Sequence, residues 1–256
     1  MYDKAMIAVS FGTSVPEAEA AIEHVEAALR AACPDRKFLR AYTSRIICRK
    51  LAREGRPVLS PEAALEQLES EGCRDVVIQP THLTPGDEYE KLCRIAAEYA
   101  PRFDTLRVGK PLIAAETDLL ALTETVCLHY PVSDEALLLM GHGSNHIANM
   151  IYPALQTAFR LNGRKDVFVG TVEGWPGLTE CLRQLMDAGY RTVSLAPLML
   201  VAGDHAINDM AGDEEDSWKS VLQNHGFAVN CTLEGLGQWN EIAALYRTHL
   251  ELLLAQ

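Results

Sequence analysis

The sequence has no long hydrophobic run and few cationic side chains, and both absences exclude classes of function. No apolar stretch reaches the ~20 residues that a membrane-spanning helix needs. The 256 residues contain 23 Lys and Arg against 35 Asp and Glu, which gives a formal net charge of −12 at pH 7. Because nucleic acids and anionic membranes bind clusters of cationic side chains, we expect neither as a partner.

Signals for export and for disulfide bonding are also missing. The first apolar stretch ends at Ser10, which is too short for a secretory signal, and no small-residue cleavage site follows it. We therefore expect a cytoplasmic protein. The seven cysteines are odd in number and widely spaced, without a C-x-x-C pair. In a cytoplasmic chain this pattern indicates buried small apolar residues, and neither disulfides nor a thiolate metal site.

Two common catalytic motifs are absent. The glycine-rich turn at residues 141–144, Gly-His-Gly-Ser, lacks the Lys and the length of a phosphate-binding loop, and it does not fit G-x-G-x-x-G. The chain has no G-x-S-x-G nucleophile elbow. We therefore expect no nucleotide cofactor and no serine-hydrolase chemistry.

Short apolar runs alternate with helical segments, and the alternation occurs twice. Continuous apolar runs predict strands buried on both faces. Strands that alternate with helices predict a parallel sheet covered on both sides. In the first half the predicted strands are 4–9, 37–42, 75–80 and 104–108; in the second half they are 136–140, 167–172, 191–196 and 227–231.

The two halves also match residue by residue, which indicates an internal duplication. The segment 76–88 aligns without gaps on 193–205, with Pro and Gly-Asp at the same spacing in both. Pro131 and its polar neighbours interrupt the pattern, so we place the boundary there. The sequence thus predicts two similar α/β lobes, 1–131 and 132–256, with the strand ends of both opening toward a cleft between them.

Matching positions of the two halves differ in chemistry. Phe11 of the first half corresponds to His142, and Glu88 corresponds to His205, while Glu173 follows a third strand of the second half. Because the carboxyl ends of parallel strands share one edge of a sheet, His142, Glu173 and His205 are expected to converge. Two imidazoles and a carboxylate suit Co²⁺, Ni²⁺, Fe²⁺ or Zn²⁺, and three protein ligands leave open coordination positions.

The pattern alone leaves a second interpretation open. A single His at the end of a strand more often forms a hydrogen bond than binds a metal. Three such residues occur in one repeat and are absent from its sister, which makes a metal site an equal alternative to the hydrogen-bonding role. His82, at the end of a first-lobe strand, is a candidate for a substrate contact or a proton relay, with a structural role as the alternative.

Five segments, at residues 9–13, 40–44, 86–91, 140–143 and 197–219, are spread over nearly the whole chain. In their residues and their order they resemble the class II chelatases, and in particular the anaerobic-pathway sirohydrochlorin cobaltochelatases (CbiK type) of cobalamin biosynthesis. The resemblance implies two α/β lobes around a cleft that receives a flat tetrapyrrole. It also implies a lyase-type reaction, the insertion of Co²⁺ into sirohydrochlorin with release of two protons.

The resemblance also implies roles for individual residues. The metal ligands would be His142, Glu173 and His205, and His142 would also accept a proton. Candidate substrate contacts lie in the first lobe: Ser10, Phe11, Thr13, Ser44, His82, Glu88 and Tyr89. The metal is a substrate, Co²⁺, with Fe²⁺ or Ni²⁺ as alternatives in vitro. Sirohydrochlorin is a polycarboxylate, and Arg45, Arg49 and Lys50 are candidates to bind it, with solvated surface charge as the alternative.

Other functions remain open at this point. The same site fits a sirohydrochlorin ferrochelatase that inserts Fe²⁺ to make sirohaem. It also fits a protein that carries metal or tetrapyrrole without turnover. A metal-dependent hydrolase is disfavoured because no second carboxylate cluster accompanies the three ligands. The sequence does not exclude a homo-oligomer.

Overall fold

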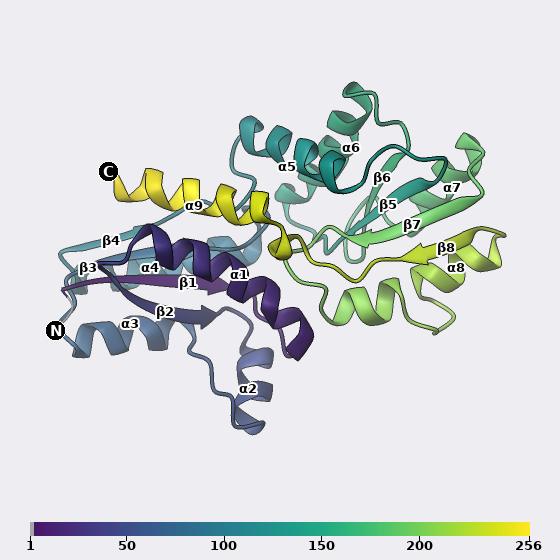
Figure 1. Ribbon diagram of the computed structural model, residues 1–256. Coiled ribbons are helices and arrows are strands. Elements are labelled where there is room, and N and C mark those ends of the chain that lie inside the picture. Colours follow the sequence, from purple (N-terminus) through teal and green to yellow (C-terminus); the bar gives the residue numbers. More distant parts are fainter. Residues whose placement is uncertain (1–2) are drawn as a thin grey trace. The chain divides into compact units, whose positions relative to one another are not determined.

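The computed structural model describes residues 3–256 and divides into two compact units (Figure 1). The first unit contains the chain up to Ala114 together with Gly237–Gln256, and the second contains Ala115–Leu236. Within residues 3–256, no helix combines the length and the apolar character that crossing a bilayer requires.

Unit 1 is built on a parallel sheet with strand order β2-β1-β3-β4. Its strands are β1 (Lys4–Ser10), β2 (Lys37–Tyr42), β3 (Asp75–Pro80) and β4 (Thr105–Val108). The central strand β1 is buried from its second residue to its last. This burial on both faces explains why its sequence is a continuous apolar run and does not alternate.

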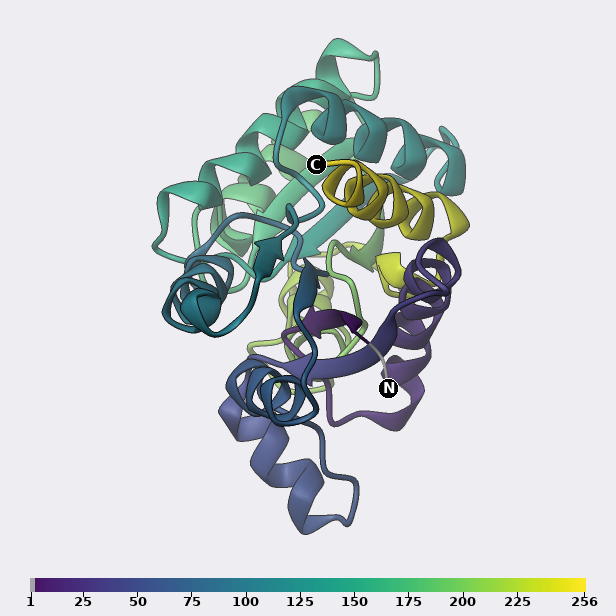
Figure 2. The ribbon, with the colours of Figure 1, turned by 90° about the vertical axis from the view of Figure 1, so that its left-hand side faces the viewer.

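Helices cover both faces of this sheet. They are α1 (Pro16–Ala32), α2 (Arg45–Arg53), α3 (Pro61–Ser70), α4 (Asp87–Tyr99) and α9 (Asn240–Leu254), with a short 3₁₀ helix, η1 (Ala100–Arg102). Leu65, Leu68 and Leu92 of α3 and α4 pack in one core cluster with β1 and β3. On the other side, α9 packs beside α1, as both views show (Figures 1 and 2).

Unit 2 repeats the topology, with strand order β6-β5-β7-β8 and all strands parallel. Its strands are β5 (Ala136–Gly141), β6 (Val167–Thr171), β7 (Thr192–Pro197) and β8 (Ala228–Cys231). Its helices are α5 (Glu116–His129), η2 (Ile147–Met150), α6 (Ile151–Leu161), α7 (Leu178–Ala188), the π-helical turn η3 (Ala206–Met210) and α8 (Trp218–Asn224), and η4 (Leu236–Gln238) follows. In each unit the first strand in sequence lies between the second and the third. This shared order agrees with the duplication inferred from the sequence.

The strands lie where the sequence predicts them, but two helices group differently from the predicted lobes 1–131 and 132–256. Helix α5 belongs to unit 2, where it packs on α6 and where Arg164 donates a hydrogen bond to the Tyr130 carbonyl just after α5 (2.8 Å). Helix α9 belongs to unit 1, because it packs on α1 and β3. The Tyr246 hydroxyl of α9 donates to the Thr81 carbonyl at 2.8 Å.

Candidate metal centre

His142 directly follows β5 in a turn that needs glycine on both sides of it. A side chain at Gly141 would collide with the ring of Tyr152. Gly143 has a φ of +79°, and a Cβ there would lie 2.5 Å from the Cβ of Thr171 and 2.7 Å from the backbone nitrogen of Gly174. Because only glycine adopts this conformation without strain and fits this space, the turn holds His142 tightly at the end of the sheet.

Glu173 is placed beside His142 by an extension of the sheet ladder beyond the strand ends. The Glu173 amide donates to the His142 carbonyl at 2.8 Å, and the Val172 amide donates to the Gly141 carbonyl at 3.0 Å. The loop after Glu173 is held from the side, because the Asn149 amide nitrogen donates to the Trp175 carbonyl at 2.5 Å. The backbone of Glu173 is therefore fixed by a hydrogen bond to the backbone of His142.

His205 comes from the segment that follows β7. The Leu198 amide donates to the Met140 carbonyl at 2.8 Å, so this segment leaves the sheet next to β5. His205 is the N-cap residue of the π-helical turn η3, whose Ala206 and Met210 are fully buried. These two apolar side chains hold the turn against the core of unit 2, and His205 lies on its partly exposed side.

The structure brings the three predicted ligands together. The ligand atoms of His142, Glu173 and His205 all lie within 4.8 Å of one another. The two imidazole rings meet edge to face, with centroids 4.7 Å apart at an interplanar angle of 88°. His142 Nδ1 lies 3.7 Å from Glu173 Oε2. The side chains are 40%, 55% and 33% exposed, so a bound cation would remain open to a large substrate.

Hydrogen bonds at Nδ1 orient both rings. His142 Nδ1 lies 2.9 Å from the Gly143 carbonyl oxygen, and His205 Nδ1 lies 2.6 Å from Asp209 Oδ2. Carbonyl and carboxylate oxygens accept hydrogen bonds, so each Nδ1 carries the proton and each Nε2 carries the lone pair that can bind a metal. In each ring the lone pair on Nε2 is therefore available to a metal ion.

The family model for cobalt chelatase (CbiK) matches residues 4–254 of this chain. The chain belongs to the CbiK cobalt chelatase family. The resemblance seen in the sequence is therefore confirmed.

Two curated relatives match the chain over most of its length. The sirohydrochlorin cobaltochelatase of Salmonella typhimurium is 41% identical, over 96% of this chain and 95% of the relative. The sirohydrochlorin cobaltochelatase CbiKC of Nitratidesulfovibrio vulgaris is 32% identical, over 98% of this chain and 90% of the relative. The match to both covers the sheets of both units.

Solved structures share the fold at low sequence identity. SirB from Bacillus subtilis with Fe³⁺ superposes with a TM-score of 0.64 at 17% identity, covering 97% of this chain and 94% of that chain. CbiX, the terminal enzyme for siroheme biosynthesis in denitrifying bacteria, superposes with a TM-score of 0.56 at 17% identity, covering 97% of this chain and 99% of that chain. These similarities support the class II chelatase fold expected for the family.

In unit 1 the same hydrogen bonds recur at the same edge of the sheet. The Ser44 amide donates to the Phe11 carbonyl at 3.2 Å, which corresponds to the bond between Glu173 and His142. Ser44 is therefore the structural counterpart of Glu173, and the counterparts of the two histidines are Phe11 and Glu88. Alignment of the two halves in the sequence paired Phe11 with His142 and Glu88 with His205. It did not pair Ser44 with Glu173, because no residue motif aligns β2 with β6.

Three candidate substrate contacts of unit 1 already use their hydroxyls within the unit. Ser10 Oγ shares a 2.7 Å hydrogen bond with Thr81 Oγ1. Thr13 Oγ1 accepts from the Val15 amide, and Ser44 Oγ caps α2 by accepting from the Ile47 amide. These bonds give the three hydroxyls a structural role at the edge of the sheet.

The other candidates in unit 1 present different chemistry. Phe11 is 46% exposed, which is unusual for a phenylalanine at the end of a buried strand. Glu88 pairs with Lys91 at 3.5 Å. The Tyr89 hydroxyl donates to the Gly109 carbonyl at 3.2 Å, and burial raises the pKa of Tyr89 to about 12. Phe11 is thus the candidate with the most apolar surface to offer a flat ring.

His82 is partly buried, and its ring nitrogens are shielded from solvent and have no hydrogen-bond partner among residues 3–256. Its backbone is held on two sides, because its carbonyl accepts from the Leu112 amide at 2.9 Å and from the Tyr246 hydroxyl at 3.2 Å. Burial lowers the pKa of His82 to about 4. His82 therefore stays neutral near pH 7, and it retains an unused donor and an unused acceptor, which is costly for a buried group.

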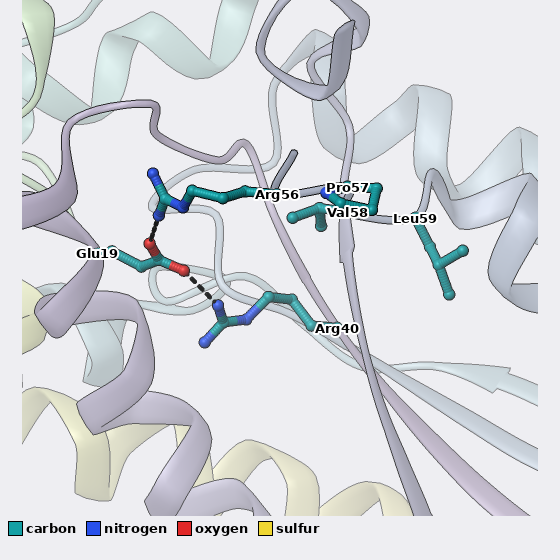
Figure 3. Close-up of a pocket in the computed structure, with 6 residues that line it drawn as sticks. All are labelled: Glu19, Arg40, Arg56, Pro57, Val58 and Leu59. Carbon is teal, nitrogen blue, oxygen red and sulfur yellow. Dashed lines mark hydrogen bonds and ion pairs between the residues drawn. The ribbon is translucent and has the colours of Figure 1, made fainter. Parts of the chain in front are cut away.

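A surface pocket of unit 1 contains two arginines, and both pair with carboxylates of the same unit (Figure 3). The pocket is lined by Glu19, Arg40, Arg56 and residues 57–59. Arg40 pairs with Glu19 at 2.6 Å and with Glu26 at 2.7 Å, and Arg56 also pairs with Glu19. Burial raises the pKa of Glu26, and the Arg40 guanidinium opposes this shift. Arg40 thus joins β2 to α1.

Proposed function

We propose that this protein is a sirohydrochlorin cobaltochelatase, which inserts Co²⁺ into sirohydrochlorin with release of two protons during cobalamin biosynthesis. Membership of the CbiK family supports this proposal, as do two full-length relatives that bear this name. The observation that carries it is the convergence of two imidazoles and one carboxylate, with ligand atoms within 4.8 Å of one another. The metal is a substrate of the reaction.

The ligand set suits a cation that has to be released again. Imidazole nitrogens and a carboxylate oxygen bind Co²⁺ well, and three protein ligands leave coordination positions for water or for ring nitrogens. The three side chains are each at least one-third exposed. A partly solvated, three-ligand site holds a cation less firmly than a closed cage of four ligands, so the four nitrogens of the macrocycle can displace the protein ligands.

The two histidines differ in the groups that contact Nδ1, and this supports a division of roles. His205 is held by a carboxylate, whereas His142 is held by a neutral backbone carbonyl and lies 3.7 Å from the Glu173 carboxylate. In the proposed mechanism His205 and Glu173 retain the cation. Once it has released the cation, His142 accepts one pyrrole proton on Nε2, and the Glu173 carboxylate stabilises the imidazolium that forms. The second pyrrole proton passes to water at the partly exposed site.

Residues at the carboxyl edge of the unit 1 sheet are the proposed contacts to the tetrapyrrole. The exposed ring of Phe11 supports a packing contact, whereas the ring nitrogens of His82 are shielded from solvent, which supports a structural role for this side chain. Helix α2 begins at this edge and carries the exposed residues Arg49 and Lys50. In a chain with a net charge of −12, this helix is the proposed contact for substrate carboxylates.

The decisive experiment measures metal insertion by purified protein. Sirohydrochlorin is titrated with Co²⁺, Fe²⁺ or Ni²⁺ with and without protein, and the change in the visible spectrum of the macrocycle reports insertion. We expect the protein to accelerate Co²⁺ insertion, and His142→Ala and His205→Ala to abolish the acceleration. The matched control is His225→Ala, because His225 is an exposed histidine of the same unit whose ring forms a hydrogen bond with the Val221 carbonyl of α8.

Each alternative function has its own outcome in this experiment. Faster insertion of Fe²⁺ than of Co²⁺ would indicate a ferrochelatase. Binding of the tetrapyrrole without acceleration would indicate a carrier protein. Normal turnover by both His142→Ala and His205→Ala would refute the proposed site.

A further inference from the structure

The carboxylate of Asp209 contacts the ring of His205, one turn further along the chain. Asp209 Oδ2 lies 2.6 Å from His205 Nδ1, which is a short, charge-assisted hydrogen bond. Both residues belong to the segment around the π-helical turn η3, where the Ala211 amide donates to the Ala206 carbonyl five residues earlier. π-Helical turns are rare in proteins and occur frequently at functional sites.

The backbone that carries this pair is held firmly in place. Ala206 and Met210, the neighbours of the pair on the turn, are fully buried in the core of unit 2. The two side chains of the pair remain 33% and 46% exposed. The turn therefore anchors its apolar side and presents the imidazole and carboxylate together on the other side.

Asp204, the acidic residue directly before His205, makes a different contact. Its Oδ1 accepts a hydrogen bond from the Asn208 side chain at 2.9 Å. His142, the other imidazole of the candidate metal centre, has the Gly143 carbonyl at its Nδ1. Asp209 thus gives His205 Nδ1 a hydrogen bond to a carboxylate, whereas the hydrogen bond of His142 Nδ1 is to a neutral carbonyl and the Glu173 carboxylate lies farther away, at 3.7 Å.

We propose that Asp209 is a positioning residue that makes His205 the stronger of the two imidazole ligands. Its carboxylate holds the proton on Nδ1, fixes the rotation of the ring and increases the electron density at Nε2. Carboxylate partners of this kind are common behind metal-bound histidines, and their removal typically weakens metal binding 10- to 100-fold. This inference rests on the proposed function, because it assumes that His205 binds the substrate metal.

The test begins with Co²⁺ alone, without tetrapyrrole. Binding is measured by titration calorimetry and by the visible absorption of bound Co²⁺ for the wild type, Asp209→Asn, Asp209→Ala and Asp209→Glu. We expect the Asn and Ala variants to bind Co²⁺ about 10- to 100-fold more weakly, with a changed absorption band. We expect Asp209→Glu to recover part of the affinity. Asp204→Asn is the matched control, and its affinity should stay within about twofold of the wild type.

A double-mutant cycle separates action through His205 from a general structural effect. If Asp209 acts through the imidazole, Asp209→Asn should cause no further loss of Co²⁺ affinity in a His205→Ala background. In the insertion assay, Asp209→Asn should raise KM for Co²⁺ more than it lowers kcat. Wild-type affinity and spectrum in both Asp209→Asn and Asp209→Ala would overturn the inference, and so would an equal loss in the His205→Ala background.

The outcomes also distinguish this inference from the proposed function. If wild-type protein binds Co²⁺ through His205 but does not accelerate insertion, the proposed function fails and the role of Asp209 stands. If wild-type protein inserts Co²⁺ and the Asp209 variants bind and insert it equally well, the role of Asp209 fails and the proposed function stands.

Discussion

Replacing Gly143 by alanine tests whether tight packing behind His142 builds the metal centre. The Gly143→Ala variant should lose folding stability for two separate reasons. The backbone φ of +79° is strained for any residue with a Cβ, at about 1 kcal/mol. The new Cβ would also lie 2.5 Å from the Thr171 Cβ and 2.7 Å from the Gly174 backbone nitrogen. Overpacking of this kind costs about 1–3 kcal/mol, so the sum is roughly 2–4 kcal/mol.

Gly163 supplies a matched control within the same unit. Its φ is +80°, almost the same as that of Gly143, but a Cβ at Gly163 would meet no heavy atom within 4 Å. The Gly163→Ala variant should therefore lose only the stability that depends on the backbone conformation, about 1 kcal/mol. The difference between the two variants isolates the packing of Gly143 against the Glu173 loop.

The assay combines thermal unfolding with Co²⁺ titration. Because a loss of 1 kcal/mol lowers the unfolding midpoint of a domain this size by about 2–4 °C, Gly143→Ala should unfold several degrees below Gly163→Ala. Displacing the loop should also separate Glu173 from His142 and weaken Co²⁺ binding at least tenfold, while Gly163→Ala keeps wild-type affinity. Equal midpoints and equal Co²⁺ affinities in the two variants would refute the packing argument.

Two further predictions concern unit 1. Burial lowers the pKa of His82 from 6.5 to about 4, so the stability that depends on neutral His82 is complete above pH 6.5 and is lost as the pH falls toward 4. The wild type should therefore lose about 3 kcal/mol of folding stability between pH 7 and pH 4. His82→Leu should show a smaller decrease in its thermal unfolding midpoint between these two pH values than the wild type. Equal decreases in the midpoint would contradict the burial of a neutral ring. The double variant Arg49→Gln, Lys50→Gln should raise KM for sirohydrochlorin severalfold and reduce its dependence on salt, measured by insertion kinetics at two ionic strengths. Arg102→Gln, which removes a cation that pairs with Glu69 at 3.1 Å, should leave both quantities unchanged, and an effect as large as that of the double variant would argue against a specific role for α2.

The sequence alone was sufficient to predict the strands and the convergence of the three candidate metal ligands. A strand buried on both faces must be apolar throughout, so β1 and β5 could be located from composition. The ends of parallel strands share an edge, so residues as far apart as His142 and His205 could be predicted to converge. Comparison of the two halves singled out these residues, because the sister repeat has Phe11 and Glu88 in their places.

The tertiary structure decided which helices belong to which unit and which groups orient the ligands. Helix α9 follows the second sheet in sequence but packs on α1 and β3, and no local periodicity encodes the partner of a helix. The carboxylate behind His205 depends on the geometry of a π-helical turn, and the pairing of Ser44 with Glu173 depends on sheet hydrogen bonds. Local sequence patterns determine which segments form strands and helices, whereas long-range packing determines which side chains meet.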